Sequence, residues 1–561
     1  MSIIRDKLIE MTIGDLVDRQ AELYPDNDCI VYPLEENIRW TYSEFRDICN
    51  KVARGMLAMG IKKGDHVAIW ATNVPEWLIL QYCSCKIGCV LVTVNTNYKQ
   101  FELEYLLRQS DTSTLFMVGG IKGNNYLQHI KGICKDLDNA DRSDINEKAL
   151  PMLKRIVFIG AEENTPAGMY NFNEIYGFAQ SVRQSAVDEI QRSLDIHDVI
   201  NMQYTSGTTG FPKGVMLTHY NVLNNGLLIG DCMELTEKDR LCIPVPLFHC
   251  FGCVLGSMAA MTHGTTLVMV DHFNPIHVME AVQREKCTGL HGVPTMFISI
   301  LNNERFDEYD FSSLRTGIMA GSPCPIKVMR EVNDKMNMGE ITIAYGLTES
   351  SPVFTQTRTD DPMEMRVSTV GKQHPFVEVK IVNPETGEEA GLNVPGEIMT
   401  RGYHIMKGYY KMPEATKLAV TEDGWLHTGD LGTVDEEGYY KITGRLKDMI
   451  IRGGENIYPR ELEEFYYTHP KVKDVQVVGV PDVRYGEEVM AYIILGDDET
   501  STEEDMIEFA RQGLSKFKAP RYVRFIDSYP TTASGKIQKY ILREMGIKDL
   551  GLEEVACIET A

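Results

Sequence analysis

Residues 204–219 combine the side chain types best suited to holding an anion. The stretch reads YTSGTTGFPKGVMLTH, with glycines, hydroxyl side chains and one cation. Glycines let backbone N–H groups approach an anion closely, and hydroxyls donate further hydrogen bonds to phosphate oxygens. This composition predicts a polyphosphate-binding loop, although a Gly/Ser/Thr surface turn has a similar composition. The residues concerned are Thr205, Ser206, Gly207, Thr208, Thr209, Gly210, Lys213 and Gly214.

The spacing within this loop excludes a Walker-type phosphate loop. A G-x-x-x-x-G-K-[ST] motif is absent, because Pro212 stands where the last glycine should be. Residues 199–204 and 215–217 are rich in strand-forming side chains. We therefore expect the loop to join strand to strand rather than strand to helix.

Length and charge restrict the class of protein. With 561 residues, the chain is long enough for two or more domains, and its hydrophobic content of 43% is that of a globular protein. The net charge of −24 argues against nucleic acid as a partner, because nucleic-acid binding requires a basic surface. A polyanionic substrate would instead need a local basic patch.

The cysteines and the apolar segments indicate a cytoplasmic protein. Thirteen cysteines are scattered without framework spacing, which predicts reduced thiols, and the N-terminus lacks an apolar signal segment. Cys250 and Cys253 form a C-x-x-C pair, but its apolar neighbours favour buried side chains over a redox or zinc site. Residues 244–270 carry no Asp, Glu, Lys or Arg, yet prolines and glycines interrupt them. We expect a loop, a buried helix at 251–261 and a buried strand at 266–270, with no transmembrane segment.

The N-terminal part has the rhythm of an α/β fold. Thr41 and Glu44 form a capping box that opens a helix, and Gly60 ends it. A strand at 65–70, an apolar helix ending at Gly88 and a strand at 89–94 follow, which predicts a parallel sheet covered by helices. The polar residues 135–150 and 181–197 are expected to be surface connections.

The C-terminal part changes its pattern twice. From Gly371 onwards, short alternating segments at 377–382, 396–400 and 439–443 predict a small antiparallel β subdomain. Beyond Arg445 we expect a helix that begins at Pro459, strands at 472–480 and 488–495, a helix at 503–514 and a strand at 522–526. These elements predict a separate α+β unit of ordinary domain size.

Five motifs, taken together, resemble those of the adenylate-forming enzymes, which comprise acyl-CoA synthetases, amino-acid adenylation domains and luciferases. They are TSGTTGFPKG, YGLTE, DGWLHTGD, GRLKDMI and TASGKIQK, and they occur in the order of that family. The resemblance covers nearly the whole chain. It implies a large N-terminal domain at 1–446, in which parallel-rich sheets carry covering helices and a β subdomain occupies about 371–446. A small mobile α+β domain at 447–561 carries the catalytic lysine, with Lys447 as the hinge.

The resemblance also implies the nucleotide contacts. Tyr345 stacks on adenine, Thr348 binds the α-phosphate and Glu349 binds Mg²⁺, which usually takes only one or two carboxylates when it is bound to ATP. Asp430 and Arg445 bind the ribose. Lys536 neutralises charge on the α-phosphoryl group, where electrostatic stabilisation has the largest effect. The remaining ATP- and AMP-binding residues implied are Thr205, Ser206, Gly207, Thr208, Thr209, Gly210, Lys213, Gly321, Ser322 and Gly346.

The implied reaction begins with a carboxylic acid and MgATP, which give an acyl-adenylate and pyrophosphate. His249 occupies the position where amino-acid-activating members carry an Asp. PLFHCFG instead resembles the acyl- and aryl-CoA synthetases, in which this histidine borders the acyl pocket, although a histidine packed beside an apolar helix stays open as the alternative. No carrier domain follows residue 561, which favours free CoA as the acceptor. The sequence as a whole, including the segments NVPEW, GYYKMPEAT and GGENIYPREL, most resembles medium-chain fatty-acyl-CoA synthetases. An aryl-CoA ligase, an enzyme that loads a separate carrier protein and a non-catalytic nucleotide binder stay open, and a homodimer is compatible with the sequence.

Two further sets of residues are expected to contact the other substrates. Gly453 and Gly454 lack side chains, so pantetheine can pass close to their backbone. Apolar or small residues around His249 favour an aliphatic or aromatic tail. The CoA set is Gly453, Gly454, Arg484, Lys516, Lys518 and Arg521; the acyl set is His249, Gly252, Leu255, Val293 and Gly317.

Overall fold

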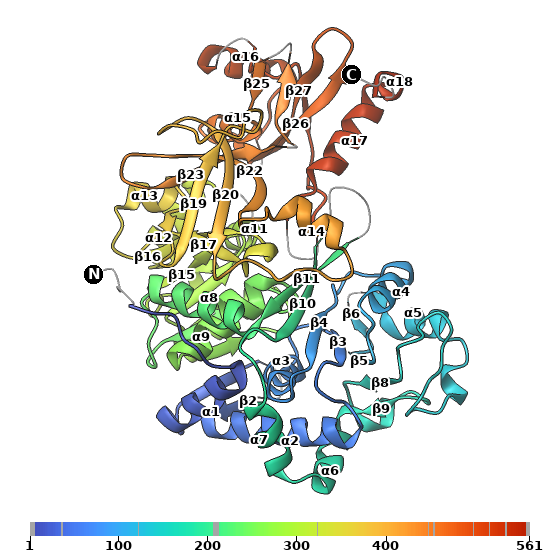
Figure 1. The fold of residues 1–561 in the computed structure, drawn as a ribbon. Helices are drawn as coiled ribbons and strands as arrows, with labels where there is room; N and C mark the ends of the chain where they lie inside the picture. Colours follow the sequence, from blue (N-terminus) through green and yellow to red (C-terminus); the bar gives the residue numbers. More distant parts are fainter. Residues whose placement is uncertain are drawn as a thin grey trace.

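The chain folds into two large sheets, a small antiparallel sheet and a C-terminal α+β region (Figure 1). This computed structural model describes every residue except 1–5, 35–36, 122, 206–211, 322–323, 447, 453–454, 498, 515–516, 533–535 and 557–561. Parallel strands alternate with helices in both large sheets, which confirms the α/β fold class expected from the sequence.

The first large sheet carries the predicted phosphate loop. Strands β3, β4 and β10 run parallel, and β11 turns back antiparallel beside β10. Successive side chains of β3 face opposite sides, so Val67 and Ile69 join one apolar cluster while Ala68 and Trp70 join another. In sheet order the strands are β21 Gly408–Tyr409, β11 Lys213–Thr218, β10 Val199–Thr205, β4 Val90–Thr93, β3 His66–Trp70, β5 Thr114–Met117, β8 Arg155–Phe158 and β9 Tyr170–Asn171.

The second large sheet has nine strands and supplies most of the predicted adenine contacts. Its central strands β12 to β16 are parallel, whereas β17 and β18 at one edge are antiparallel. In sheet order the strands are β18 Lys372–Gln373, β17 Val353–Gln356, β16 Glu340–Gly346, β15 Thr316–Met319, β14 Gly289–Gly292, β12 Arg240–Ile243, β13 Thr266–Met269, β1 Asp28–Tyr32 and β2 Ile38–Thr41.

The helices cover the sheets and fill the space between them. They are α1 Ile13–Leu23, α2 Tyr42–Ala58, α3 Pro75–Ile87, α4 Gln100–Gln109, α5 Tyr126–Ile133, α6 Phe172–Phe178, α7 Gln184–Arg192, α8 His219–Cys232, α9 Ala259–His263, α10 Pro275–Glu285, α11 Pro294–Leu301, α12 Ile326–Lys335, α13 Met363–Ser368, α14 Pro413–Ala419, α15 Pro459–Tyr466, α16 Glu503–Gly513, α17 Lys539–Asp549 and α18 Glu553–Ala556. The capping box of Thr41 and Glu44 forms as predicted at the start of α2.

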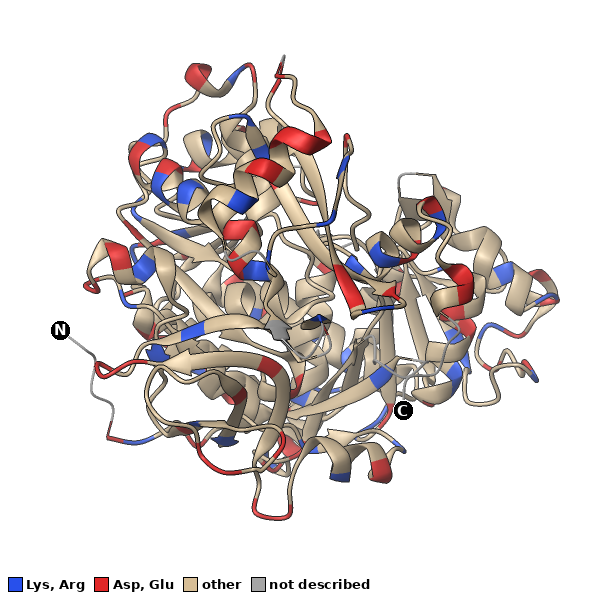
Figure 2. Cartoon of the chain, turned by 90° about the horizontal axis from the view of Figure 1, so that it is seen from above, with Lys and Arg blue, Asp and Glu red and all other residues tan. Residues whose placement is uncertain are grey.

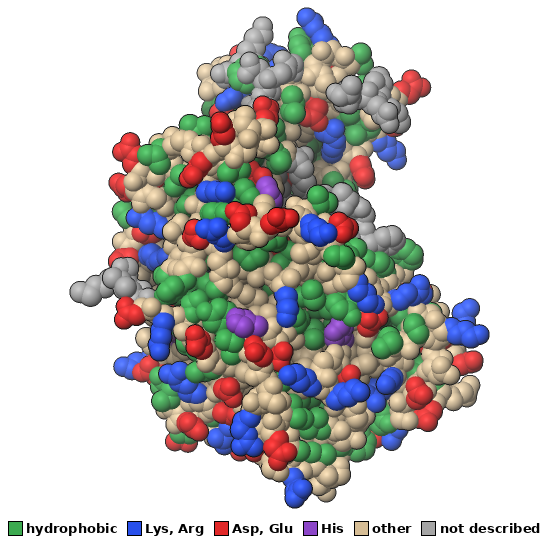
Figure 3. Space-filling model, viewed as in Figure 1, with side chains coloured by type: hydrophobic (Ala, Val, Ile, Leu, Met, Phe, Trp, Pro, Cys, Tyr) green, Lys and Arg blue, Asp and Glu red, His purple; other side chains and the backbone are tan. Residues whose placement is uncertain are grey.

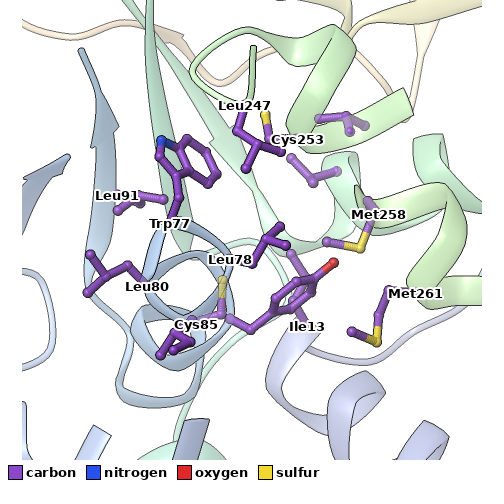
Figure 4. Close-up of a cluster of buried hydrophobic side chains, with 14 of the residues drawn as sticks. Ile13, Trp77, Leu78, Leu80, Cys85, Leu91, Leu247, Cys253, Met258 and Met261 are labelled. Atoms are coloured by element: carbon purple, nitrogen blue, oxygen red, sulfur yellow. The ribbon is translucent and has the colours of Figure 1, made fainter. Parts of the chain in front are cut away.

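Helix α3 lies in the apolar layer shared by the two large sheets. Every residue from Trp77 to Ile87 is buried, which is typical of a helix that is surrounded by protein on all sides. Figure 4 shows side chains of α3, among them Trp77 and Leu78, in one apolar cluster with Met258 and Met261. Full burial of each large apolar side chain contributes about 1.5–3 kcal/mol, so this layer fixes the two sheets against each other.

Two segments differ from the sequence-based expectation. Residues 181–197, expected to be a surface connection, contain helix α7, whose Val187 and Gln191 are buried. The Gln191 amide bonds Asp15, Asp18 and Lys86, so tertiary contacts stabilise a helix in a polar stretch. Residues 244–270 form the expected loop, buried helix and buried strand, but the helix begins as a π-helix, η4 Phe251–Met258, before α9.

The small antiparallel sheet follows the second large sheet in the chain. Its strands are β19 Val377–Val382, β20 Gly396–Gly402, β22 Leu426–Val434 and β23 Tyr440–Arg445. The segments at 377–382, 396–400 and 439–443 are strands, as expected. The DGWLHTGD motif also enters a strand, because β22 begins at Leu426 and pairs with both neighbours.

The C-terminal region builds its own sheet and apolar cluster from residues beyond 449. The sheet consists of β25 Glu455–Ile457, β24 Ile450–Arg452, β27 Gly486–Leu495, β26 Val472–Asp482 and β28 Tyr522–Phe525. Helix α15 begins at Pro459 as predicted, and Leu462 and Tyr466 pack into this cluster. Helix α17 was not predicted from the sequence, and its Leu542 is buried against the opposite face of the sheet.

The surface mixes both signs of charge, and the described cysteines lie in the interior. Lysine and arginine are interspersed with aspartate and glutamate over the elements, and also on the face shown in space-filling view (Figures 2 and 3). Cys250 and Cys253 are buried thiols that share the Gln203 amide, which confirms the prediction of buried side chains. Within the described ranges, no helix is both long and apolar enough to cross a membrane.

Candidate active site

The predicted phosphate loop joins the ends of two antiparallel strands. Thr205 ends β10 and faces Lys213, the first residue of β11, in the strand register. The strand-to-strand connection expected from the sequence is thereby confirmed. Because β10 is parallel to β4, Thr205 lies at the carboxyl edge of this sheet, where α/β proteins bind their ligands.

Tyr345 and Asp430, predicted to bind adenine and ribose, are in direct contact. The Tyr345 hydroxyl donates a hydrogen bond of 2.8 Å to Oδ2 of Asp430. Tyr345 lies on β16 of the nine-stranded sheet and Asp430 on β22 of the small sheet. The fold therefore brings together two residues that the sequence could only relate through family resemblance.

A buried carboxylate supports the strand that carries Asp430. Oε1 of Glu397 accepts the Gly429 N–H at 3.1 Å, and Oε2 lies 3.0 Å from Nδ1 of His427. The Thr428 hydroxyl accepts the Asp430 N–H at 3.1 Å. These contacts fix the backbone on both sides of Gly429 and so orient Asp430.

Glu349, the predicted metal ligand, receives hydroxyl groups from two other segments. Its Oε1 lies 2.8 Å from the Tyr409 hydroxyl and 3.5 Å from the Thr205 hydroxyl. Burial and the nearby Glu349 carboxylate raise the pKa of Tyr409, so the phenol stays protonated and donates. The ammonium of Lys213 lies over the same tyrosine ring, 4.9 Å from its centroid.

The residues around Glu349 fit a magnesium ion carried by ATP. Within the described part of the chain, Oε2 of Glu349 has no hydrogen-bond or ion-pair partner. The same part holds no group of three His, Cys, Asp or Glu side chains suited to a metal. One carboxylate completed by phosphate oxygens and water is the arrangement that Mg²⁺ adopts with nucleotides. Glu349 would hold the ion, which would neutralise phosphate charge.

The positive charge of Lys536, in the C-terminal region, contributes to the lowered pKa of His249, in the N-terminal region. Burial, and to a smaller extent the positive charge of Lys536, lowers the pKa of His249 to about 4. Nδ1 of His249 accepts the Phe251 N–H at 3.2 Å, which leaves the proton of the neutral ring on Nε2. His249 is thus a neutral N–H donor near a cation at neutral pH.

Two hydrogen bonds join Thr532 to Lys536. The Thr532 N–H donates to the Lys536 carbonyl at 2.8 Å, and the Thr532 hydroxyl accepts the Lys536 N–H at 3.1 Å. Three residues further on, Lys539 forms an ion pair of 2.5 Å with buried Glu463. The ion pair ties the base of this loop to helix α15.

The acyl set is divided between two kinds of environment. Val293 of the acyl set lies beside Gly321 of the predicted nucleotide set, since a Cβ on Gly321 would be 3.1 Å from Val293 and 3.9 Å from Phe251. Gly252 and Gly317 instead meet backbone: a Cβ would lie 2.4 Å from the Pro246 carbonyl and 2.0 Å from the Leu290 carbonyl. Close packing of the chain thus explains why these two positions carry no side chain.

Two predicted CoA residues, Arg484 and Arg521, line an open hollow of the C-terminal region. Arg484 lies there with its guanidinium over the Tyr485 ring, 5.0 Å from the centroid. Arg521 lines it too, and pairs with Asp482 at 2.9 Å. Lys518 instead forms an ion pair of 2.6 Å with Glu461.

Thr348, Gly346 and Arg445 are the remaining predicted nucleotide-site residues that lie within the described ranges. Thr348 is buried in the 3-10 turn η6 Thr348–Ser350. A Cβ on Gly346 would lie 1.8 Å from the Pro352 carbonyl, so only glycine fits there. The side chain of Arg445 is not described, although its backbone pairs with Asp430 in the strand register. Predictions for the following residues lie outside the described ranges: Ser206, Gly207, Thr208, Thr209, Gly210, Ser322, Lys447, Gly453, Gly454 and Lys516.

Three residues of the site were missed by the sequence analysis. Tyr409 and Glu397 contact predicted residues, as described above. His291, on β14, accepts the Ile318 N–H on Nδ1 at 3.2 Å and donates from Nε2 to the Leu255 carbonyl at 3.1 Å, which links η4 to the sheet. The GYYKMPEAT motif contains Tyr409, but no spacing in the sequence relates it to Glu349.

Comparison with known proteins settles the family. The family of AMP-binding enzymes matches residues 17–410, and the C-terminal domain of AMP-binding enzymes matches residues 461–536. The chain belongs to the AMP-binding enzyme family. The two matches cover the large N-terminal part and most of the C-terminal region of this AMP-binding enzyme.

Relatives cover almost the whole AMP-binding enzyme. The putative acyl-CoA synthetase YngI of Bacillus subtilis (strain 168) is 53% identical over 546 residues, which is 97% of this chain and 99% of that protein. The mitochondrial medium-chain acyl-CoA ligase ACSF2 of Mus musculus is 42% identical, covering 96% of this chain and 88% of its own length. The anthranilate CoA ligase AuaEII, solved with anthranoyl-AMP, has a TM-score of 0.84 at 25% identity, over 97% of this chain and 99% of its own.

Proposed function

We propose that this enzyme is an AMP-forming acid–CoA ligase that activates a medium- or long-chain fatty acid. The observation that carries the proposal is the site that gathers Tyr345 with Asp430 and Glu349 with Tyr409, within reach of the positive charge of Lys536 at His249. A cation contributed by the C-terminal region suits stabilisation of the charge that develops during attack on the α-phosphorus.

In the first half-reaction, a carboxylate oxygen of the acid attacks the α-phosphorus of ATP. The bond from this phosphorus to the bridging oxygen of the β-phosphate breaks, and pyrophosphate leaves. Lys536 neutralises charge on the α-phosphoryl oxygens, while Lys213 and Thr205 hold the β- and γ-phosphates that leave. His249, neutral with its proton on Nε2, donates to the acid without presenting a second charge.

In the second half-reaction, the sulfur of CoA attacks the acyl carbon. The thiol proton is released to solvent, the bond between the acyl carbon and the AMP oxygen breaks, and acyl-CoA and AMP form. The hollow with Arg484 and Arg521 supplies the local cations that the phosphates of CoA need on a protein of net charge −24. We place Gly453 and Gly454 along the pantetheine path.

The two half-reactions require different partners for the same adenylate. We propose that residues 447–561 rotate about Lys447 relative to residues 1–446, withdrawing Lys536 and admitting CoA. The separate sheet and apolar cluster of the C-terminal region support this division, because few buried contacts would have to break.

The choice of acid rests on the apolar character of the site and on the relatives. The segment from Phe251 to Met258 is entirely buried and uncharged, which favours an aliphatic tail. ACSF2 is named as a medium-chain acyl-CoA ligase, which agrees with a fatty acid. The structural likeness to an anthranilate CoA ligase makes an aromatic acid the second candidate.

A panel of carboxylic acids, assayed for AMP and pyrophosphate with CoA and MgATP present, tests the proposal. We expect octanoate to release AMP in a CoA-dependent reaction and to exceed benzoate and anthranilate. Preference for the aromatic acids would select the aryl-CoA alternative. Pyrophosphate exchange without CoA turnover would indicate a carrier-protein acceptor, and ADP formation or no exchange with any acid would contradict an AMP-forming ligase.

A further inference from the structure

Tyr409 lies between two oppositely charged residues of the phosphate site. Its hydroxyl is 2.8 Å from Oε1 of Glu349, and its ring centroid is 4.9 Å from the ammonium of Lys213. Neither charged side chain forms an ion pair within the described ranges. The tyrosine thus contacts both charges while they stay apart.

The backbone of Tyr409 is held firmly enough to fix this arrangement. Strand β21 pairs with β11, where Tyr409 is the register partner of Val215, two residues beyond Lys213. The Tyr409 N–H donates to the Thr416 hydroxyl at 2.9 Å, and the next N–H donates to the Gly214 carbonyl at 2.8 Å. Lys213 and Val215 point to the same side of the strand, so Lys213 is directed towards the Tyr409 ring.

The contacts of Glu349 are unequal at its two oxygens. The hydroxyls of Tyr409 and Thr205 both donate to Oε1, and Oε2 has no hydrogen-bond or ion-pair partner within the described ranges. The backbone of Glu349 is also anchored, because its carbonyl accepts the Met406 N–H at 2.9 Å. A carboxylate held through one oxygen presents the other in a fixed direction.

We propose that Tyr409 is a positioning residue for MgATP. Its hydroxyl turns Oε2 of Glu349 towards the metal, and its ring holds Lys213 away from Glu349, so that the cation stays available to the phosphates. The inference rests on the proposed ATP-dependent function and extends it to a residue that binds neither substrate directly. Partners of a metal ligand typically change metal affinity by about 10- to 100-fold when they are removed.

Two variants separate the hydroxyl from the ring. Tyr409→Phe removes the hydrogen bond to Glu349 and keeps the ring beneath Lys213, whereas Tyr409→Ala removes both. The matched control is Tyr410→Phe, whose hydroxyl bonds Asp111 at 2.9 Å and not Glu349. Thermal unfolding of each purified variant checks the fold, and Tyr409→Phe, the milder change, carries the test by itself if Tyr409→Ala does not fold.

Calorimetric binding of ATP, with Mg²⁺ or with EDTA, provides the readout. For Tyr409→Phe we expect the affinity for MgATP to fall about 10-fold and the affinity for metal-free ATP to stay unchanged. The Mg²⁺ concentration for half-maximal pyrophosphate exchange should rise by a similar factor. Tyr409→Ala should also lower the affinity for metal-free ATP, because Lys213 can then pair with Glu349 and is less available to the phosphates.

A double variant tests whether the hydroxyl acts through Glu349. Adding Tyr409→Phe to Glu349→Gln should cause no further loss of MgATP affinity. The inference is overturned if Tyr409→Phe binds MgATP with wild-type affinity, or if the substitution lowers the affinities for MgATP and for metal-free ATP by the same factor. Failure of the wild type to bind ATP under either condition would instead contradict the proposed function.

Discussion

The Tyr345 hydroxyl donates a 2.8 Å hydrogen bond to the carboxylate of Asp430, linking the nine-stranded sheet to the small antiparallel sheet. The two residues lie 85 positions apart in the chain. An aromatic face and a carboxylate joined in this way match the two halves of a nucleoside, a base and a ribose. The contact therefore defines the orientation that we propose for bound ATP.

Asp430→Asn should weaken ATP binding with little effect on the KM for the acid. A hydrogen bond to a charged group contributes about 1.5–3 kcal/mol, which corresponds to a loss of roughly 10- to 100-fold. Steady-state kinetics with ATP and with 2′-deoxy-ATP measure the effect. The preference for ATP over its deoxy analogue should shrink in the variant, and an unchanged preference would remove the ribose role from Asp430.

Lys536→Ala should lose adenylation and keep thioester formation. Removing a preorganised electrostatic contact typically costs about 100- to 1,000-fold in rate, and only the first half-reaction develops charge at the α-phosphoryl group. Pyrophosphate exchange reports the first half-reaction, and conversion of synthetic acyl-adenylate with CoA reports the second. Lys548→Ala, on the exposed last turn of α17, is the control. Equal losses in both assays would contradict a role confined to adenylation.

Buried neutral histidines should make the protein less stable as the pH falls below about 6.5. Burial lowers the pKa of His219, His249 and His291 to about 4 and that of His404 to about 3, from 6.5. The unfolded chain then binds protons that the native chain does not, so each histidine lowers the free energy of unfolding by about 1.4 kcal/mol per pH unit between these limits. Burial raises the pKa of Asp474 to about 6, which opposes the trend below that pH.

Urea denaturation at pH 7, 6 and 5 measures this pH dependence of stability. His404→Gln should flatten it by about 1.4 kcal/mol per pH unit, because one depressed pKa is removed. His197→Gln, at an exposed position, should leave it unchanged. A stability that stays constant from pH 7 to pH 5 would contradict the burial of these rings in their neutral form.

The sequence by itself determined the family, the α/β class and the local structure around the motifs. Hydrophobic periodicity located most strands, and the capping box of Thr41 and Glu44 located the start of α2, because these signals depend on neighbouring residues alone. Polar composition was misleading for residues 181–197, where α7 is stabilised by contacts with α1 and α3 that lie far away in the chain.

Only the tertiary structure decided which side chains meet. The contacts of Tyr345 with Asp430 and of Glu349 with Tyr409 each join separate elements of the fold, and the charge of Lys536 lowers the pKa of His249 from a distant part of the chain. The two hydrogen-bond distances follow from the way distant strands are placed, and the protonation state of His249 follows from its burial. No periodicity in the chain encodes such a distance, so the motifs could predict the set of groups at the site but not how those groups constrain one another.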